Sequence, residues 1–116
     1  MADNKRVPAR FYRNQSGREP LREWLQALSK KDKRAIGVDI MTVEYGWPIG
    51  MPTCRSLGKG LYEVRTNLDG RIARVLFCFH GAGLVLLHGF IKKTQRTPKS
   101  DLDLARARQR EIDKHD

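Results

Sequence analysis

The Asp69–Gly70 pair lies between two segments rich in apolar and aromatic residues, and it constrains the fold more than any other feature of the chain. An Asp-Gly pair in this setting is typical of a two-residue β-hairpin turn, because both central positions of that turn need residues that tolerate a positive φ. Residues 61–65 and 72–80 are therefore predicted to be neighbouring antiparallel strands.

The same turn fixes which residues face each other across the hairpin. It places Arg65 directly opposite Arg74, with both side chains expected on the solvent-facing surface of the sheet. Facing like charges destabilise a sheet by roughly a few tenths of a kcal/mol or more, so we expect the pair to hold an anion. Two alternatives remain open: the register slips by one residue, or Glu63 and Asp69 neutralise the arginines as a surface network.

The other elements follow from apolar spacing and turn residues. In chain order we predict a strand over 7–13, helices over 20–28 and 31–45, a loop over 46–60, the hairpin, a strand over 84–88 and a helix over 98–114 with Thr97 as its N-cap. This order predicts an α+β fold: a single domain, with a core over about residues 7–113, whose helices pack on one face of a small, mainly antiparallel sheet.

Charge limits the range of partners. The chain of 116 residues has 23 Lys and Arg against 13 Asp and Glu, a formal net charge of +10. Such an excess on a small surface favours polyanions such as RNA, DNA or an acidic protein. The start is polar and no apolar run is long enough to span a bilayer, so we expect a cytoplasmic protein. Cys54 and Cys78 lack zinc-like spacing, and we expect no metal and no cofactor.

A second basic cluster, residues 91–96, follows the last predicted strand and precedes a helix N-terminus. Basic side chains beside the exposed N–H groups of a helix start form a suitable environment for phosphate, although a solvated loop is the alternative. If Gly81–Ala82 is the turn of the second hairpin, Lys93 shares a face of the sheet with Arg74. The arginines of the last helix are spaced by two, and we interpret them mostly as surface residues: Arg106, Arg108 and Arg110.

Three motifs resemble those of a known family. They are LYEVR at 61–65, RVLF at 74–77 and LLHGFIKKTQRTP at 86–98. These motifs, together with the approach to the first helix, resemble the phage-derived, HigB-like branch of the RelE/ParE toxin superfamily. Its members are the toxins of bacterial type II toxin–antitoxin modules. The likeness extends over 11–108.

The resemblance implies the RelE-like fold, with two N-terminal helices on a twisted sheet and a further helix after it. It also implies a metal-independent endoribonuclease that cuts mRNA on the ribosome and is inhibited by an antitoxin, which we expect to be of the helix-turn-helix type. The resemblance implies catalytic roles for the four residues at matching positions of this sequence: Arg65, Arg74, Lys92 and Lys93. We expect the flanking basic residues to bind RNA: Arg71, Arg96 and Lys99. Parts of the superfamily use a His or Tyr near the chain end, where this sequence offers only His115.

A site made of Arg and Lys is chemically coherent for RNA cleavage. The 2′-OH of RNA is the nucleophile, so the protein has to align the attack and stabilise a highly charged transition state. Arginine supplies paired donors to phosphate oxygens, and lysine supplies a point charge for the leaving oxygen.

Two other functions stay open. A ParE-like member would poison DNA gyrase without cleaving nucleic acid. A non-catalytic RNA-binding module should present stacking aromatic side chains on its sheet. Phe77 and Phe79 have the opposite parity from Arg74, so we expect them in the core. Cys78 and His80 share one face as a possible thiol–imidazole pair, but Cys78 lies in an apolar run and is expected to be a core residue.

Overall fold

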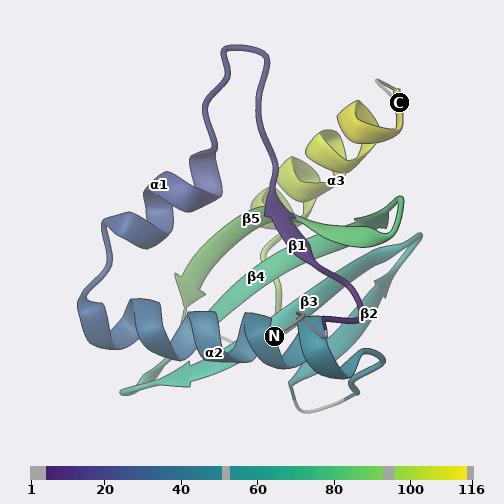
Figure 1. The fold of residues 1–116 in the computed structure, drawn as a ribbon. Coiled ribbons are helices and arrows are strands. Elements are labelled where there is room, and N and C mark those ends of the chain that lie inside the picture. The colour runs from purple at the N-terminus through teal and green to yellow at the C-terminus, as the bar shows by residue number, and fades with distance from the viewer. Residues whose placement is uncertain (1–4, 51–52, 93–95, 115–116) are drawn as a thin grey trace.

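One mixed sheet separates the helices into two layers in the computed structural model, which describes residues 5–50, 53–92 and 96–114. The elements are β1 (Ala9–Phe11), α1 (Pro20–Gln26), α2 (Lys30–Gly46), β2 (Cys54–Gly58), β3 (Leu61–Leu68), β4 (Arg71–His80), β5 (Gly83–Lys92) and α3 (Lys99–Lys114). The strand order is β1-β5-β4-β3-β2, with β1 parallel to β5 and the other pairs antiparallel (Figure 1). None of the described helices is both long and apolar enough to cross a membrane.

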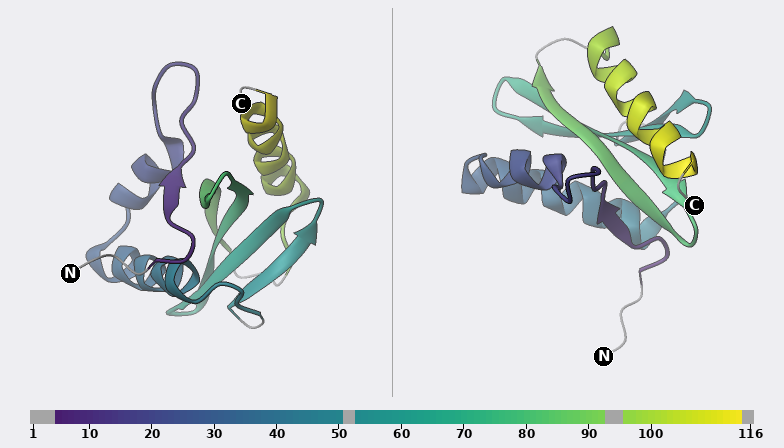
Figure 2. Two further views of the ribbon diagram at one scale, coloured as in Figure 1. Left: turned by 45° about the vertical axis from the view of Figure 1, so that its right-hand side comes forward. Right: turned by 90° about the horizontal axis from the view of Figure 1, so that it is seen from above.

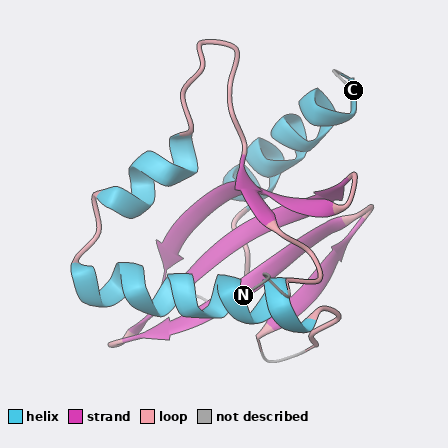
Figure 3. Ribbon diagram, in the orientation of Figure 1, coloured by secondary structure: helices cyan, strands magenta, loops and turns pink. Residues whose placement is uncertain are grey.

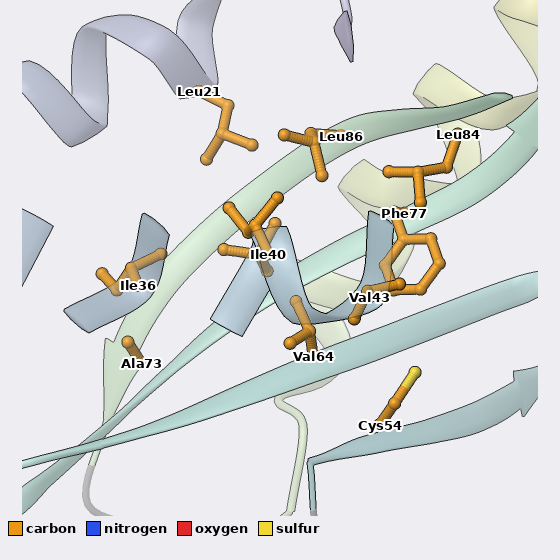
Figure 4. Packing of buried hydrophobic residues seen from close by; sticks show 11 residues of the cluster. Leu21, Ile36, Ile40, Val43, Cys54, Val64, Ala73, Phe77, Leu84 and Leu86 are labelled. Atoms are coloured by element: carbon orange, nitrogen blue, oxygen red, sulfur yellow. The ribbon is translucent and has the colours of Figure 1, made fainter. Parts of the chain in front are cut away.

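The larger core lies between the sheet and α1 and α2. Helix α2 contributes Ile36, Ile40 and Val43, because their spacing places all three on one face of the helix. They meet the inward side chains of β3 and β4, among them Val64 and Phe77 (Figure 4). The predicted core position of Phe77 is confirmed, and Phe79 packs against the same cluster.

Helix α3 covers the opposite face of the sheet, so the expectation that all helices share one face is wrong (Figure 2). Its apolar contact is small, since Ala105 is its one buried residue. Hydrogen bonds supply much of the remaining attachment. Arg106 donates to the carbonyls of Leu57 and Gly58 at 2.9 Å, and Arg108 donates to that of Leu87 at 2.7 Å. These two arginines therefore clamp α3 to the sheet, which corrects their interpretation as surface residues.

Strand β2 occupies part of the segment predicted as a loop. It is short and lies at the sheet edge beside β3, which adds a fifth strand to the predicted sheet (Figure 3). Its connection to β3 is tight, with positive φ values at Gly58, Lys59 and Gly60. Glycine readily adopts this conformation. Glycine and proline signals spread over 46–60 therefore concealed a five-residue strand that ends at the turn.

The predicted hairpin register is confirmed, since Arg65 pairs with Arg74 across β3 and β4. The second hairpin also turns at Gly81–Ala82, because His80 pairs with Gly83. A β-bulge between Leu76 and Phe77 then shifts the β4–β5 ladder by one residue. As a result Lys92 pairs with Ile72, on the face of the sheet that carries Arg74. The parity that favoured Lys93 assumed an unbroken ladder, and Lys93 itself lies outside the described residues.

The C-terminal helix begins at Lys99, one residue later than predicted. Its first turn is closed by a hydrogen bond from the Leu102 N–H to the carbonyl of Pro98. Because the helix begins at Lys99, Thr97 lies two residues before it and not at the predicted N-cap position. The Thr97 hydroxyl donates to the Glu63 carboxylate at 2.6 Å. Thr97 instead fastens the start of α3 to β3.

Candidate functional site

A buried carboxylate organises the basic residues on the α3 side of the sheet. Glu63, in β3, is 0% exposed and accepts the hydroxyl of Thr97. Its Oε1 lies 3.4 Å from Nε of Arg55, its partner across the β2–β3 ladder, and 4.0 Å from Nε of Arg65. A buried carboxylate requires such partners to remain ionised. We call these residues, with Arg74 and Lys92, the Glu63 cluster.

Arg74 is the buried member of the cluster. It is 0% exposed, and its Nη1 donates to the carbonyl of Arg96 at 3.0 Å. Its guanidinium carbon lies 5.9 Å from the ring centroid of Phe90, the residue opposite it in β5. The expectation of a solvent-facing Arg74 is therefore wrong, because the segment leading into α3 lies over it.

Burial lowers the pKa of Arg74, and the charges of Arg65 and Arg55 act in the same direction, while Glu63 raises it. An arginine remains protonated under these conditions. Three guanidinium groups thus surround one carboxylate among the described residues, a formal excess of two positive charges.

The exposed part of the cluster comes from three strands. The side chain of Arg65 in β3 is 15% exposed, and that of Arg55 in β2 is 34% exposed. Lys92, at the end of β5, is exposed and makes no ion pair with any described residue. Arg55 and Arg65 lie together at Glu63, and Lys92 lies on the same face of the sheet, two residues beyond the Phe90 that is opposite Arg74.

The other predicted residues take different positions. Arg71 points to the α2 side, where its Nη2 lies 3.0 Å from the carboxylate of Asp32, so it is separated from the cluster by the sheet. Arg96 and Lys99 are exposed at the start of α3. Lys93 and His115 lie outside the described residues.

Sequence reasoning did not identify Arg55 as a site residue. Its strand was expected to be a loop, so no partner across a ladder could be assigned to it. From the sequence, Glu63 was considered only as a surface residue that neutralises the charges of the arginines. In the structure Glu63 is the buried centre of the cluster. The spacing of Glu63 and Arg65, two residues apart in one strand, indicates a shared face and was the available signal.

A second polar contact secures α3 near the cluster. Nε2 of His88 lies 2.7 Å from Oδ1 of Asp101, in the first turn of α3, and the His88 ring stacks on Phe90 at 5.7 Å. His88 therefore connects β5 to α3. Cys78 is 2% exposed, and burial raises the pKa of its thiol to about 11, as expected for a core thiol.

The arrangement suits a phosphodiester. Guanidinium groups present paired N–H donors to phosphate oxygens, and a nearby ammonium group adds a point charge. Arg55 and Arg65 lie within ion-pair distance of Glu63, although neither hydrogen-bonds its Oε1, so their charges are already gathered before a ligand arrives. The arginines beside Glu63 can thus stabilise negative charge on a bound ligand.

A comparison with known families agrees with this architecture. The family model described as "Phage derived protein Gp49-like (DUF891)" matches residues 23–110, which is 88 of the 116 residues. The match runs from α1 into α3 and includes the whole Glu63 cluster. No curated protein matches the chain. The chain therefore belongs to the Gp49-like family of phage-derived proteins, a RelE-like family of toxin-like proteins.

Proposed function

We propose that this protein is a HigB-like toxin of a type II toxin–antitoxin pair, and that it cleaves mRNA bound to the ribosome. The proposal is supported chiefly by the Glu63 cluster, in which three guanidinium groups gather around one buried carboxylate. The family supports a toxin-like role, and the cluster supplies the chemistry.

In this mechanism the 2′-oxygen of a nucleotide attacks the adjacent phosphorus. A 2′,3′-cyclic phosphate forms and the bond to the 5′-oxygen breaks. The proton of the 2′-OH passes to water, and the leaving 5′-oxygen takes up a proton from water. Arg65 and Arg55 hydrogen-bond the non-bridging oxygens, which gain negative charge in the transition state. Lys92 stabilises the leaving oxygen, and Lys93, predicted from the sequence motif, belongs to the same proposed set. The ribosome aligns the mRNA for attack.

Arg74 has a different proposed role from Arg65. Because it is buried and donates to the Arg96 carbonyl, it acts as a positioning residue that holds the segment entering α3. Arg96 and Lys99, which are exposed beside this segment, contact the RNA backbone in the proposal. Phosphate contacts of this kind fix the register of a nucleic acid without reading its sequence.

The proposed inhibitor is an antitoxin with an acidic segment. A chain with a net charge of +10 and a partly exposed arginine cluster attracts such a segment, which would cover Arg55 and Arg65 and prevent ribosome binding.

The direct test is induced expression of the chain in bacteria, followed by mapping of mRNA 5′ ends. We expect growth arrest and new 5′ ends inside translated regions, which disappear when initiation is blocked. A gyrase supercoiling assay on the purified protein serves as the control for the ParE-like alternative. Inhibition of gyrase without mRNA cleavage, or normal growth with a well-folded protein, would refute the proposal.

A further inference from the structure

A surface pocket of about 390 Å³ lies at the end of α3 that is remote from the Glu63 cluster. Its walls come from β1, from the loop that follows β1, from the end of β4 and from the last turns of α3. In Figure 1 the loop continues upward from the end of β1, and the C-terminal half of α3 rises to the right of it. Six of its lining residues carry the argument: Arg10, Tyr12, Arg13, Asn14, His80 and Glu111.

The pocket has a cation available for a ligand. Arg10 is exposed and makes no hydrogen bond or ion pair with any described residue. Arg13, next to it in the lining, is 67% exposed at its side chain and has one long contact of 3.5 Å, to Glu19. Both guanidinium groups can therefore turn toward an anion at little cost, and the His80 ring adds a further polar group to the lining.

The loop that carries Arg13 is already ordered. Oδ1 of Asn14 accepts hydrogen bonds from the backbone N–H groups of Ser16 and Arg18 and from the Ser16 hydroxyl, at 2.8 to 3.0 Å. The Asn14 N–H donates to the Arg18 carbonyl, which closes the loop. A wall held in this way does not have to be ordered when a ligand binds.

The opposite wall is a carboxylate fixed in place. Oε2 of Glu111 accepts the hydroxyl of Tyr12 at 2.7 Å, and the guanidinium carbon of Arg108 lies 5.2 Å from the centroid of the Tyr12 ring. Burial and the Glu111 carboxylate raise the pKa of Tyr12 to about 12, so the hydroxyl keeps its proton as a donor. Oε1 of Glu111 makes no hydrogen bond with a described residue.

Guanidinium groups on one side and a carboxylate on the other match the two ends of one ligand class. Arginine side chains bind a phosphate group through paired hydrogen bonds. A sugar hydroxyl donates a hydrogen bond to a carboxylate, as at the ribose sites of other proteins. The volume lies within the range of small-molecule sites. We propose that this pocket binds one ribonucleotide, with its phosphate on Arg10 and Arg13 and its 2′-OH on Glu111.

This site does not depend on RNA cleavage. Arg74 and His80 are six residues apart in β4, which corresponds to about 20 Å along the strand, and α3 packs on the sheet between them. The pocket is thus separate from the Glu63 cluster, and its occupancy is measured by binding rather than by activity.

The test is a titration of the full chain with AMP, 2′-dAMP, adenosine and inorganic phosphate, followed by NMR and calorimetry. We expect AMP to shift the amide signals of Arg10, Arg13 and Asn14, and to bind several-fold more tightly than 2′-dAMP. Arg10→Ala should weaken AMP binding about tenfold, the effect of losing a charge-assisted hydrogen bond. Arg34→Ala removes the same charge from an exposed site on α2 and should leave the affinity unchanged.

Three results would overturn the inference: no AMP-dependent shift in the pocket, equal weakening by Arg10→Ala and Arg34→Ala, or equal affinity for AMP and 2′-dAMP. A six-nucleotide oligoadenylate distinguishes the two sources of the nucleotide. If the oligoadenylate binds more tightly than AMP and Arg10→Ala abolishes this binding, the pocket takes a nucleotide within RNA. If the oligoadenylate binds no more tightly than AMP, the pocket takes a free nucleotide. If the wild-type protein binds AMP as expected but cleaves no mRNA, the proposed function is refuted and the assignment of this pocket stands.

Discussion

Arg65 and Arg74 face each other in one ladder, yet one reaches the surface and the other does not. Their pairing could be predicted because it depends on a local turn of two residues. The burial of Arg74 could not, since it depends on the position of Arg96, which is 22 residues away in the chain and is placed by the packing of α3. Local patterns therefore identify the face of a residue but not what covers that face.

Replacing Glu63 by Gln should strongly destabilise the protein. The substitution keeps the shape of the side chain but leaves Arg55, Arg65 and Arg74 without the carboxylate that offsets their charges. Removing one partner of a buried ion pair costs about 3–5 kcal/mol, so we expect a loss of that order in the free energy of unfolding in urea.

The matched control is Glu23→Gln. Glu23 pairs with Arg18 at 2.6 Å, but both side chains are exposed and the pair is screened by solvent, so this substitution should leave the stability almost unchanged. If the two variants lose equal stability, Glu63 is not the centre of the cluster.

Tyr12 should make stability depend on alkaline pH. Its pKa in the folded protein is about 12, above the ordinary value of 10.0, through burial and the hydrogen bond to Glu111. A raised pKa means that the folded state holds the proton more tightly. The contribution is therefore complete below pH 10.0 and is lost as the pH rises to about 12. The loss should be on the order of 3 kcal/mol.

Urea unfolding at several pH values in this range measures the effect. Tyr12→Phe has no phenol to titrate, so its stability should change less over the same range. The same pH dependence in both proteins would show that other groups are responsible.

Among the elements, β2 and the bulge in the β4–β5 ladder show where local sequence patterns are insufficient. Turn residues before and after β2 conceal a strand that gains its hydrogen bonds only at the edge of an existing sheet. The bulge leaves Leu87 of β5 without a partner in the β4 ladder, and nothing in the apolar run from Leu84 to Leu87 marks it, but it decides that Lys92 shares the face of Arg74. The fold class and the two N-terminal helices were predictable, because they follow from turn residues and apolar spacing over whole elements.

Gly89 in β5 lies directly beneath side chains of α1. A Cβ atom there would lie 2.6 Å from side-chain atoms of both Leu21 and Trp24. Gly89→Ala should therefore lower the free energy of unfolding by about 1–3 kcal/mol, the usual effect of overpacking.

Gly37→Ala is the comparison for this prediction. Gly37 lies inside α2, where an added Cβ atom would meet nothing within 4 Å beyond the local helix backbone. Alanine is also the better helix former by about 1 kcal/mol. Thermal unfolding should show opposite signs for the two variants. A neutral Gly89→Ala would mean that α1 can move away from β5 freely.

At the scale of the whole molecule, charge and function are linked through the face that α3 covers. The Glu63 cluster lies at the start of α3, the pocket proposed to bind a nucleotide lies near its end, and Arg106 and Arg108 hold the helix between them. The net charge of +10 attracts a polyanion to any face, and in the proposed function the Glu63 cluster is the place where the phosphodiester binds and reacts.

The most direct test of the proposal that the Glu63 cluster is the catalytic site is a measurement of cleavage of ribosome-bound mRNA. It compares the purified wild-type protein with the variants Arg65→Ala and Arg34→Ala. Arg65 is a partly exposed member of the Glu63 cluster, and Arg34 is an exposed arginine on α2. Loss of one transition-state donor reduces rates by about 10²–10³, so we predict that decrease for Arg65→Ala, wild-type cleavage for Arg34→Ala, and normal thermal unfolding for both. Equal rates for Arg65→Ala and the wild type, with both proteins folded, would contradict the assignment of the Glu63 cluster as the catalytic site.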